Sequence, residues 1–359
     1  MENKETIAMD IINILNDAIE KKASDIFIVS GASVGYRISG QIHRSEEGFL
    51  TPDDTKNLIE QIYDLAGYDK TTLLEEKSEQ DFSFSIPGTG RFRINVYRQR
   101  GSLAAVLRNV LFTVPDYREI NIPDKIMKLA DYNKGIVLVT GAAGSGKSTT
   151  LTCIIDRINS TRCGHIITIE DPIEYLHKHK KSIVSQREIN IDSQDYAKAL
   201  RAALRQAPDV ILVGEMRDYE TINIAMTAAE TGQLILATLH TIGASDTIDR
   251  VIDVFPPMQQ HQIRVQLSMV LKAVVSQQLI PTVEGGLVPA FEIMTVNNAI
   301  RTMIREEKMH QIDTILQSSD GMQTMDSDIM RLYNNGIITK ENAIKYSSNP
   351  ELMRKRINV

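Results

Sequence analysis

The chain has 359 residues, of which 42% are hydrophobic and 24% are charged, and its 46 acidic and 40 basic residues give a net charge of −6. This length favours two domains, each large enough for its own core, in an ordinary globular protein. The acidic balance, without a basic stripe, argues against a nucleic-acid-binding protein.

The N-terminal residues 1–22 carry acidic residues throughout and lack the uninterrupted apolar core of a signal peptide. No apolar run approaches the roughly 18 residues that a membrane span needs. We therefore expect a cytoplasmic protein with no direct membrane insertion, which reaches a membrane only through a partner. The two cysteines, Cys153 and Cys163, form no CxxC pair and no Cys/His cluster, so they predict reduced thiols rather than a zinc site or a disulfide framework.

Residues 1–111 predict an α+β domain, in which helices lie beside an antiparallel meander. Apolar residues at helical spacing indicate a helix over residues 5–22. A second helix, with Thr51 as its N-cap and Gly67 as its stop, has a proline at its first position. Strands are expected within residues 24–30, 33–44 (two strands about a turn at Ser39–Gly40), 81–87, 90–101 and 102–110.

The segment 111–125 contains two prolines and no clear periodicity, so we place a linker at residues 112–122. The second domain then comprises residues 123–359. Its four apolar runs, each ending in polar residues, are typical of the strands of a parallel α/β sheet under helices. These runs lie at 135–141, 165–172, 209–215 and 233–240, and amphipathic helices are expected over 148–158, 195–206 and 219–231.

The stretch GAAGSGKST follows the first of these strands and precedes a helix, which is the context of the phosphate-binding loop G-x-x-x-x-G-K-[ST]. Its backbone N–H groups and the helix N-terminus predict a site for the phosphates of ATP. Lys147 is expected to reach the β- and γ-phosphates, Ser148 to ligate Mg²⁺ and Thr149 to lie near the α-phosphate. The residues of this predicted nucleotide site are Gly141, Ala142, Ala143, Gly144, Ser145, Gly146, Lys147, Ser148 and Thr149.

Polar residues end the other strands, and because ligands bind beyond the carboxyl ends of parallel strands, we expect them to converge with Lys147 on one edge. Glu170, followed by Asp171, and Glu215 are candidates for two acidic roles, one beside the metal and one as general base. The spacing of Glu170 and Glu215 in the sequence does not show which carboxylate has which role. His240 has two readings, a sensor of the γ-phosphate or a structural residue at a strand end.

Five arginines crowd the last strands of the first domain: Arg91, Arg93, Arg98, Arg100 and Arg108. They form either a solvated strand face or, in part, arginine fingers that reach a phosphate across a domain or subunit boundary. The one local basic run, His177–Lys181, is too short to cover a duplex and is expected to be a solvated turn.

These features together resemble the hexameric ATPases of type II and type IV secretion, and within them the branch that retracts type IV pili in twitching motility. The similarity extends over nearly the whole chain, and its last element is similar to the helix that marks the retraction branch. Five segments carry it in the family's order: ASDIFI (23–28), IITIEDPIEY (166–175), ILVGEMRD (211–218), TGQLILATLHT (231–241) and NAIRTMIREEK (298–308).

The resemblance implies a PAS-like first domain and a RecA-like P-loop ATPase domain with a helical C-terminal part. It implies a homo-hexameric ring that couples ATP hydrolysis to pilus retraction. Glu170 would activate the attacking water, Glu215 would lie on the Mg²⁺ side, and His240 would contact the nucleotide. Each of these roles is an expectation from the family's motifs.

The resemblance also implies that Arg91, Arg93 and Arg108 supply charge to a nucleotide at a subunit interface. The helix Asn298–Lys308 would contact the inner-membrane platform protein of the pilus machine. Residue spacing alone favours a simpler reading of that helix, in which three apolar residues pack it onto the core. Those residues are Ile300, Met303 and Ile304.

Two segments depart from the family pattern. Gln233 replaces a histidine, so no titratable role is expected there, and Ala142–Ala143 replaces Pro-Thr in the phosphate loop, where the backbone does the binding. We still expect ATP hydrolysis. The alternatives are a pilus-assembly or type II secretion ATPase, which would normally add a tetracysteine zinc insertion, a RecA-like nucleic-acid motor, and a non-hydrolysing adaptor.

Overall fold

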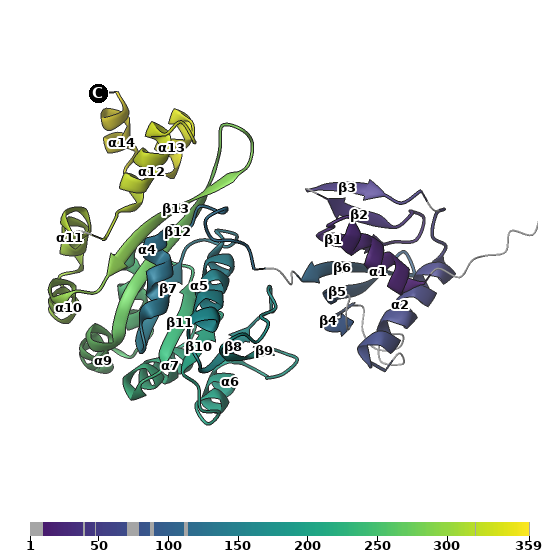
Figure 1. Ribbon diagram of the computed structural model, residues 1–359, viewed down its shortest axis with the longest axis horizontal. Coiled ribbons are helices and arrows are strands. Elements are labelled where there is room, and N and C mark those ends of the chain that lie inside the picture. Colours follow the sequence, from purple (N-terminus) through teal and green to yellow (C-terminus); the bar gives the residue numbers. More distant parts are fainter. Residues whose placement is uncertain are drawn as a thin grey trace, which may run out of the picture. The chain divides into compact units, whose positions relative to one another are not determined.

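The computed structural model describes residues 10–38, 40–46, 48–69, 79–86, 90–110, 114–319 and 321–358. The chain divides into two compact units, Met1–Thr113 with Glu174–Leu176 and Val114–Ile173 with His177–Val359 (Figure 1). Parts of four predicted features lie outside the described residues: the start of the first helix (5–9), Ser39, Pro87 and the start of the linker (112–113).

The first unit contains an antiparallel six-stranded sheet in the order β3-β2-β1-β6-β5-β4. The two helices described in this unit and one face of the sheet enclose a single apolar core. The predicted strands and helices are confirmed as far as they are described. Their bounds are α1 (Ile11–Glu20), β1 (Asp25–Ile28), β2 (Gly35–Ile38), β3 (Gln41–Arg44), α2 (Pro52–Ala66), β4 (Glu79–Ile86), β5 (Gly90–Gln99) and β6 (Ser102–Val110).

Helix α2 begins and ends where its sequence predicts. The Thr51 hydroxyl accepts a hydrogen bond from the Asp54 N–H at 3.2 Å, and the Asp54 carboxylate accepts one from the Thr51 N–H at 2.8 Å. This reciprocal pair satisfies two N–H groups that the first turn would otherwise leave unpaired. Gly67 ends the helix in a left-handed conformation (φ 68°) that glycine adopts without strain.

The second unit is built on a seven-stranded sheet in the order β13-β12-β7-β11-β10-β8-β9 (Figure 1). All neighbouring strands are parallel except β12 and β13. The predicted α/β class is confirmed, whereas a PAS-like first unit stays a prediction. The strands are β7 (Gly135–Thr140), β8 (His165–Glu170), β9 (Ile183–Glu188), β10 (Val210–Val213), β11 (Leu234–Leu239), β12 (Leu271–Pro281) and β13 (Leu287–Thr295).

Helices cover both faces of this sheet, as continuous apolar strands predict. On β7, Ile136 and Leu138 enter a core with α6 to α11, while Val137 and Val139 enter a second core with α4 and α5. The helices are α4 (Asp124–Met127), η1 (Lys128–Asp131), α5 (Lys147–Thr161), α6 (Tyr196–Ala203), α7 (Tyr219–Thr231), α8 (Ala244–Asp253), α9 (Pro257–Val270), α10 (Asn298–Arg305), η2 (Met309–Gln311) and α11 (Ile312–Ser318).

Three C-terminal helices, α12 (Met325–Asn334), α13 (Lys340–Tyr346) and α14 (Pro350–Ile357), pack on the far end of the β12–β13 hairpin (Figure 1). Glu292 on β13 links them to the sheet. Its buried carboxylate accepts the N–H of Ala244, the first residue of α8, at 2.8 Å, and also the N–H of Met325, the first residue of α12. Burial raises the pKa of Glu292, and the two hydrogen bonds oppose that rise.

The second unit differs from expectation in two respects. Strands β9, β12 and β13 are additional to the four predicted ones. Residues 114–122, which the sequence places in a linker, pack on the core beside α5 through Val114, Tyr117, Ile120 and Ile122. Their apolar side chains explain this packing, because prolines without periodicity exclude a helix but do not exclude burial. Within the described ranges, every helix is too short or too polar to span a bilayer.

Candidate functional site

The carboxyl ends of β7, β11, β10 and β8 lie side by side on one edge of the sheet. In register, Thr140 of β7 is paired with Leu239 of β11, and Val213 of β10 is paired with Ala237 and Ile169 on its two neighbours. Glu170, Glu215 and His240 lie at or just after the ends of β8, β10 and β11, and the phosphate loop that leads to Lys147 follows β7. The parallel order therefore brings these candidate residues and the phosphate loop to the same edge.

The phosphate loop closes around Lys147. Its ammonium group donates to the carbonyl oxygens of Gly141 at 2.8 Å and Ala142 at 2.9 Å, and the side chain is only 8% exposed. Gly144 and Gly146 have φ values of 75° and 88°, which turn the chain sharply into the first turn of α5. Lys147 is thus held in the middle of a ring of backbone groups.

Strand β12 supplies residues that the sequence did not single out. The Gln277 carboxamide oxygen accepts a 2.7 Å hydrogen bond from the Thr150 hydroxyl on α5. A Cβ at Gly141 would lie 2.2 Å from the Gln277 carbonyl oxygen, so only glycine fits where the loop leaves β7. The Ser276 hydroxyl is 2.7 Å from the Thr140 hydroxyl and accepts from the Gly243 N–H. Strand β12 therefore supports both the phosphate loop and the loop after His240.

The loop fits a phosphate ligand by two observations on its own atoms. The Ser145 hydroxyl is buried, and it has no hydrogen-bond partner among the described residues. Gly146 immediately precedes α5, so the unpaired N–H groups of the first turn lie beside the loop. Ser148, the candidate Mg²⁺ ligand, and Thr149 are half-buried in this turn. A bound phosphate would supply acceptors for the buried donors.

Glu215 lies between two potential cations. Its carboxylate contacts the guanidinium of Arg217 and lies 3.2 Å from His240 Nε2. Glu215 is the most buried of the three, with 16% of its side chain exposed against 75% for Arg217. The structure thus brings His240 to Glu215, and it adds Arg217, which the sequence analysis did not select. A positively charged neighbour two residues along the same loop was visible in the sequence but had no assigned role.

Glu170 accepts hydrogen bonds from two neutral groups. These donors are the Thr168 hydroxyl at 2.5 Å and the Gln186 amide at 3.2 Å. Gln186 belongs to β9, the additional edge strand, so this strand orients a candidate catalytic group. Glu215 therefore contacts a guanidinium, while Glu170 accepts from a hydroxyl and an amide.

A cleft of about 530 Å³ opens beside these carboxylates and is lined in part by Asp171, Tyr196 and Glu215. Burial raises the pKa of the Tyr196 phenol, and the nearby charges of Asp171, Glu215 and Glu170 raise it further. A Cβ at Gly214 would lie 2.9 Å from the Tyr196 hydroxyl, so this glycine gives the phenol access to the strand end. Tyr196 is a neutral hydroxyl at the centre of an acidic cleft.

Arg91, Arg93 and Arg108 belong to the first unit, on the sheet face opposite its described helices. Along β5, Phe92, Ile94 and Val96 are buried, and Arg91 and Arg93 alternate with them. Pairing sets Arg93 beside Arg108, and Arg108 beside Asp25.

The Asp25 carboxylate forms ion pairs with Arg108 at 3.0 Å and with Arg37 at 3.2 Å. Among the described residues, Arg93 has no carboxylate within 4.0 Å, which leaves its charge available. Arg108, although 69% exposed, already has a partner within its own sheet. The other candidate in this group, Arg91, is half-buried.

Two further sequence features are placed by the second unit. In α10, Ile300 and Ile304 are buried against the core and Met303 packs beside them, so the simpler reading of this helix is confirmed for that face. The Gln233 side chain accepts a hydrogen bond from the Thr231 hydroxyl at 2.9 Å, at the start of β11. Gln233 therefore lies at the opposite end of this strand from His240.

The family pattern of the type II/IV secretion system proteins matches residues 1–286. The chain belongs to this family. Its sequence is 44% identical over 345 residues to the type IV pilus retractation ATPase PilT of Pseudomonas aeruginosa, covering 96% of this chain and 99% of the relative. It is 41% identical over 350 residues to a twitching motility protein of Neisseria gonorrhoeae, covering 97% and 93%.

Among solved structures, the fold is similar to a crystal structure of the pilus retraction motor PilT with bound ADP. The TM-score is 0.88 at 47% identity, and the match covers 97% of this chain and 99% of that chain. The resemblance to the retraction branch of this secretion family, expected from five short motifs, is confirmed. The roles of the individual site residues stay predictions.

Proposed function

We propose that the chain is a P-loop ATPase that hydrolyses ATP with Mg²⁺ to retract type IV pili. One observation carries the chemistry: Glu170, Glu215 and His240 lie at or just after the ends of adjacent parallel strands, on the same sheet edge as the phosphate loop that follows β7 and leads to Lys147. The similarity to retraction ATPases over nearly the whole chain supports the proposal that ATP hydrolysis here drives pilus retraction. Belonging to a secretion ATPase family supports the hydrolase activity itself.

The phosphate loop binds ATP through its backbone N–H groups, and Lys147 exchanges its carbonyl partners for phosphate oxygens. Ser148 holds Mg²⁺ from the first turn of α5. Mg²⁺ supplies charge neutralisation at the phosphates. Glu215 takes the metal side, because β10 is nearer to β7, and so to the phosphate loop, than β8 is. Glu170, with neutral hydrogen-bond donors, orients and activates the attacking water.

The working assembly is a homo-hexameric ring, in which Arg93, supported by Arg91 and Arg108, reaches a nucleotide held by another subunit. The first domain is PAS-like and the second RecA-like. The protein works in the cytoplasm at the inner face of the cytoplasmic membrane, through a platform protein that contacts the helix Asn298–Lys308. It needs no nucleic acid and does not insert into the membrane.

The test is a count of surface pili after Lys147→Ala replaces the native residue in the source organism. Loss of retraction predicts more pili and no surface motility. The exposed Lys198 on α6 provides a control, and Lys198→Ala should change neither. Fewer pili in the Lys147→Ala strain would assign the motor to pilus assembly, and an unchanged count would separate it from pili.

A further inference from the structure

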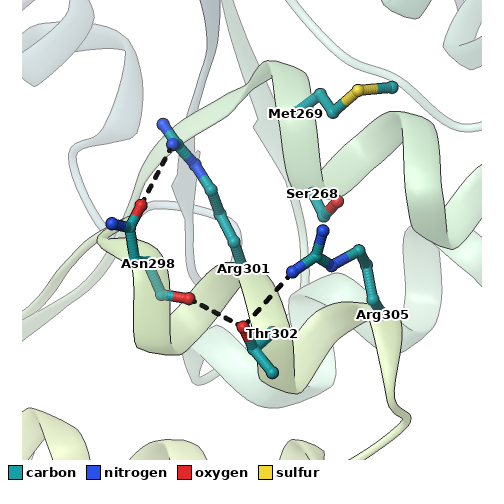
Figure 2. Close-up of a pocket in the computed structure, with 6 residues that line it drawn as sticks. All are labelled: Ser268, Met269, Asn298, Arg301, Thr302 and Arg305. Atoms are coloured by element: carbon teal, nitrogen blue, oxygen red, sulfur yellow. Dashed lines mark hydrogen bonds between the residues drawn. The ribbon is translucent and has the colours of Figure 1, made fainter.

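A basic pocket lies between the last turn of α9 and the polar face of α10, away from the nucleotide edge. Its volume is about 370 Å³. Figure 2 shows Arg301 and Arg305 rising from α10 on the side of Ser268 and Met269 of α9. Residues 298, 301, 302 and 305 share one face of the helix, because they are separated by three or four positions. The opposite face is packed on the core.

Within the described ranges, the arginines of this pocket have only long hydrogen bonds to neutral groups. Arg301 donates to the Asn298 side chain at 3.4 Å, and Arg305 donates to the Thr302 hydroxyl at 3.3 Å (Figure 2). The Arg301 Nε is buried and has no hydrogen-bond partner among the described residues. A buried charged donor left unpaired is costly, so the pocket is incomplete as an isolated structure.

Other cations gather behind the pocket. Burial lowers the pKa of Lys272, and the positive charges of Arg301 and Lys134 lower it further. In the described part of the chain, no carboxylate lies within 4.0 Å of any of these groups. The acids nearby are engaged elsewhere: Glu306 pairs with Lys308, and Glu307 pairs with Arg264. The pocket therefore concentrates positive charge that the chain does not neutralise.

From these contacts we propose that the pocket holds an acidic side chain, Asp or Glu, of the partner protein that receives the motor's force, next to an apolar residue of that partner. The inference rests on the proposed function, because it names the chemistry by which the motor grips its partner. A guanidinium presents a planar fork of donors that matches a carboxylate. Met269, with 56% of its surface exposed, lies at the pocket and offers an adaptable apolar contact.

An anionic lipid surface fits this pocket less well. The exposed Glu306 and Glu307 follow α10 directly, and the whole chain carries a charge of −6. An extended anionic surface would meet these acids, whereas one carboxylate on a protein segment would meet only the arginines.

The experiment uses Arg305→Glu in the full-length protein, with Arg354→Glu on α14 as the control at another exposed arginine. Arg305 is exposed, so its replacement should leave thermal stability unchanged. We expect unchanged ATPase activity of the purified protein but loss of pilus retraction in cells. Suppressor mutations that restore motility should change an Asp or Glu to Lys or Arg in another protein. The control variant should retain both activities.

Retained motility in Arg305→Glu, and also in the milder Arg301→Gln, would overturn the proposal. If the wild-type protein binds phosphatidylglycerol vesicles and Arg305→Glu abolishes that binding, the occupant of the pocket is a lipid headgroup and not a protein side chain. Suppressors within this chain alone would indicate a second copy as the occupant. Failure of the proposed function is recognised separately, because Lys147→Ala would then leave pili unchanged as well.

Discussion

At the residue scale, Glu170 and Glu215 lie on neighbouring strand ends but have different surroundings. Glu215 contacts Arg217 and lies near His240, while Glu170 accepts from two neutral groups. We expect Glu170→Gln to lower turnover by about 10²–10⁴-fold, the range for a lost general base. The dependence of the ATPase rate of Glu170→Gln on Mg²⁺ concentration should be the same as that of the wild-type protein. ATPase rates measured across a Mg²⁺ titration test this.

Glu215→Gln should instead abolish turnover, with nucleotide still bound, and should raise the Mg²⁺ concentration needed for nucleotide binding, because a metal-side carboxylate is lost. Binding of a fluorescent ADP analogue provides the check that the site is intact. Shifted Mg²⁺ dependence in Glu170→Gln but not in Glu215→Gln would reverse the two roles. Substantial turnover by Glu215→Gln would remove it from the site.

His177, in the short basic run, carries a pH prediction for stability. Burial lowers the pKa of His177 to about 4, from 6.5, and its Nδ1 has no hydrogen-bond partner among the described residues. Between these values the unfolded chain binds more protons than the folded one, so stability falls as pH falls from about 6.5 to about 4. The loss is at most about 3 kcal/mol.

The comparison for this prediction is His177→Gln, which cannot titrate. Melting temperatures measured from neutral to mildly acidic pH should fall more steeply for the wild-type protein than for this variant. Parallel curves would mean that His177 is solvated in the folded state, as its place in a basic run first indicated.

At the element scale, the junction between β7 and the phosphate loop depends on the neighbouring strand β12. Gly141→Ala would place a Cβ 2.2 Å from the Gln277 carbonyl oxygen, while Gly144→Ala would meet nothing within 4 Å. Both positions have positive φ. We expect Gly141→Ala to lose more unfolding free energy than Gly144→Ala by about 1–3 kcal/mol, the cost of overpacking. Denaturant unfolding without nucleotide measures the free energy of unfolding of both variants. Equal losses would mean that the Gln277 carbonyl oxygen does not crowd a Cβ at position 141.

The four nucleotide-edge strands were predictable because a parallel strand buried on both faces must be apolar throughout. Strand β12 was not, since Ser276 and Gln277 interrupt its apolar run. Their polar side chains are buried because each has a hydrogen-bond partner from another element, Thr140 and Thr150 respectively. Such partners are distant in sequence, and no local pattern reveals them.

The candidate site was predictable to a similar degree. Motifs at strand ends identify Lys147, Glu170, Glu215 and His240, because the sheet edge collects them. One of the hydrogen bonds that orient Glu170 comes from tertiary packing, through Gln186 on an unpredicted strand. Sequence therefore indicated which groups gather but not which hydrogen bonds orient them.

At the scale of the whole molecule, a nucleotide site shared between subunits has a kinetic consequence. An isolated protomer would lack the arginine of its neighbour, which contributes roughly 10³–10⁵ in rate for arginine fingers. We expect specific ATPase activity to rise with protein concentration as rings form. Rates measured alongside light scattering test this, and a flat profile across the assembly range would refute a shared site.

Mixing two inactive variants tests the same idea directly. Lys147→Ala lacks the phosphate-binding lysine, and Arg93→Ala lacks the arginine whose charge has no carboxylate within 4.0 Å among the described residues. Mixed rings contain some sites with both groups present, so the mixture should regain part of the wild-type rate. No recovery, in rings shown to contain both variants, would place Arg93 outside the site.

The carboxylate of Glu292 has a mechanical consequence. Two helices begin at this one buried group: α8, which follows the loop after His240, and α12, which begins the C-terminal helices. Pulling either helix away would leave a buried acceptor short of a donor, at a cost of about 1–3 kcal/mol. We therefore expect a displacement of the C-terminal helices to shift α8 beside the nucleotide edge, and a displacement of α8 to shift α12, because both helices begin at this carboxylate.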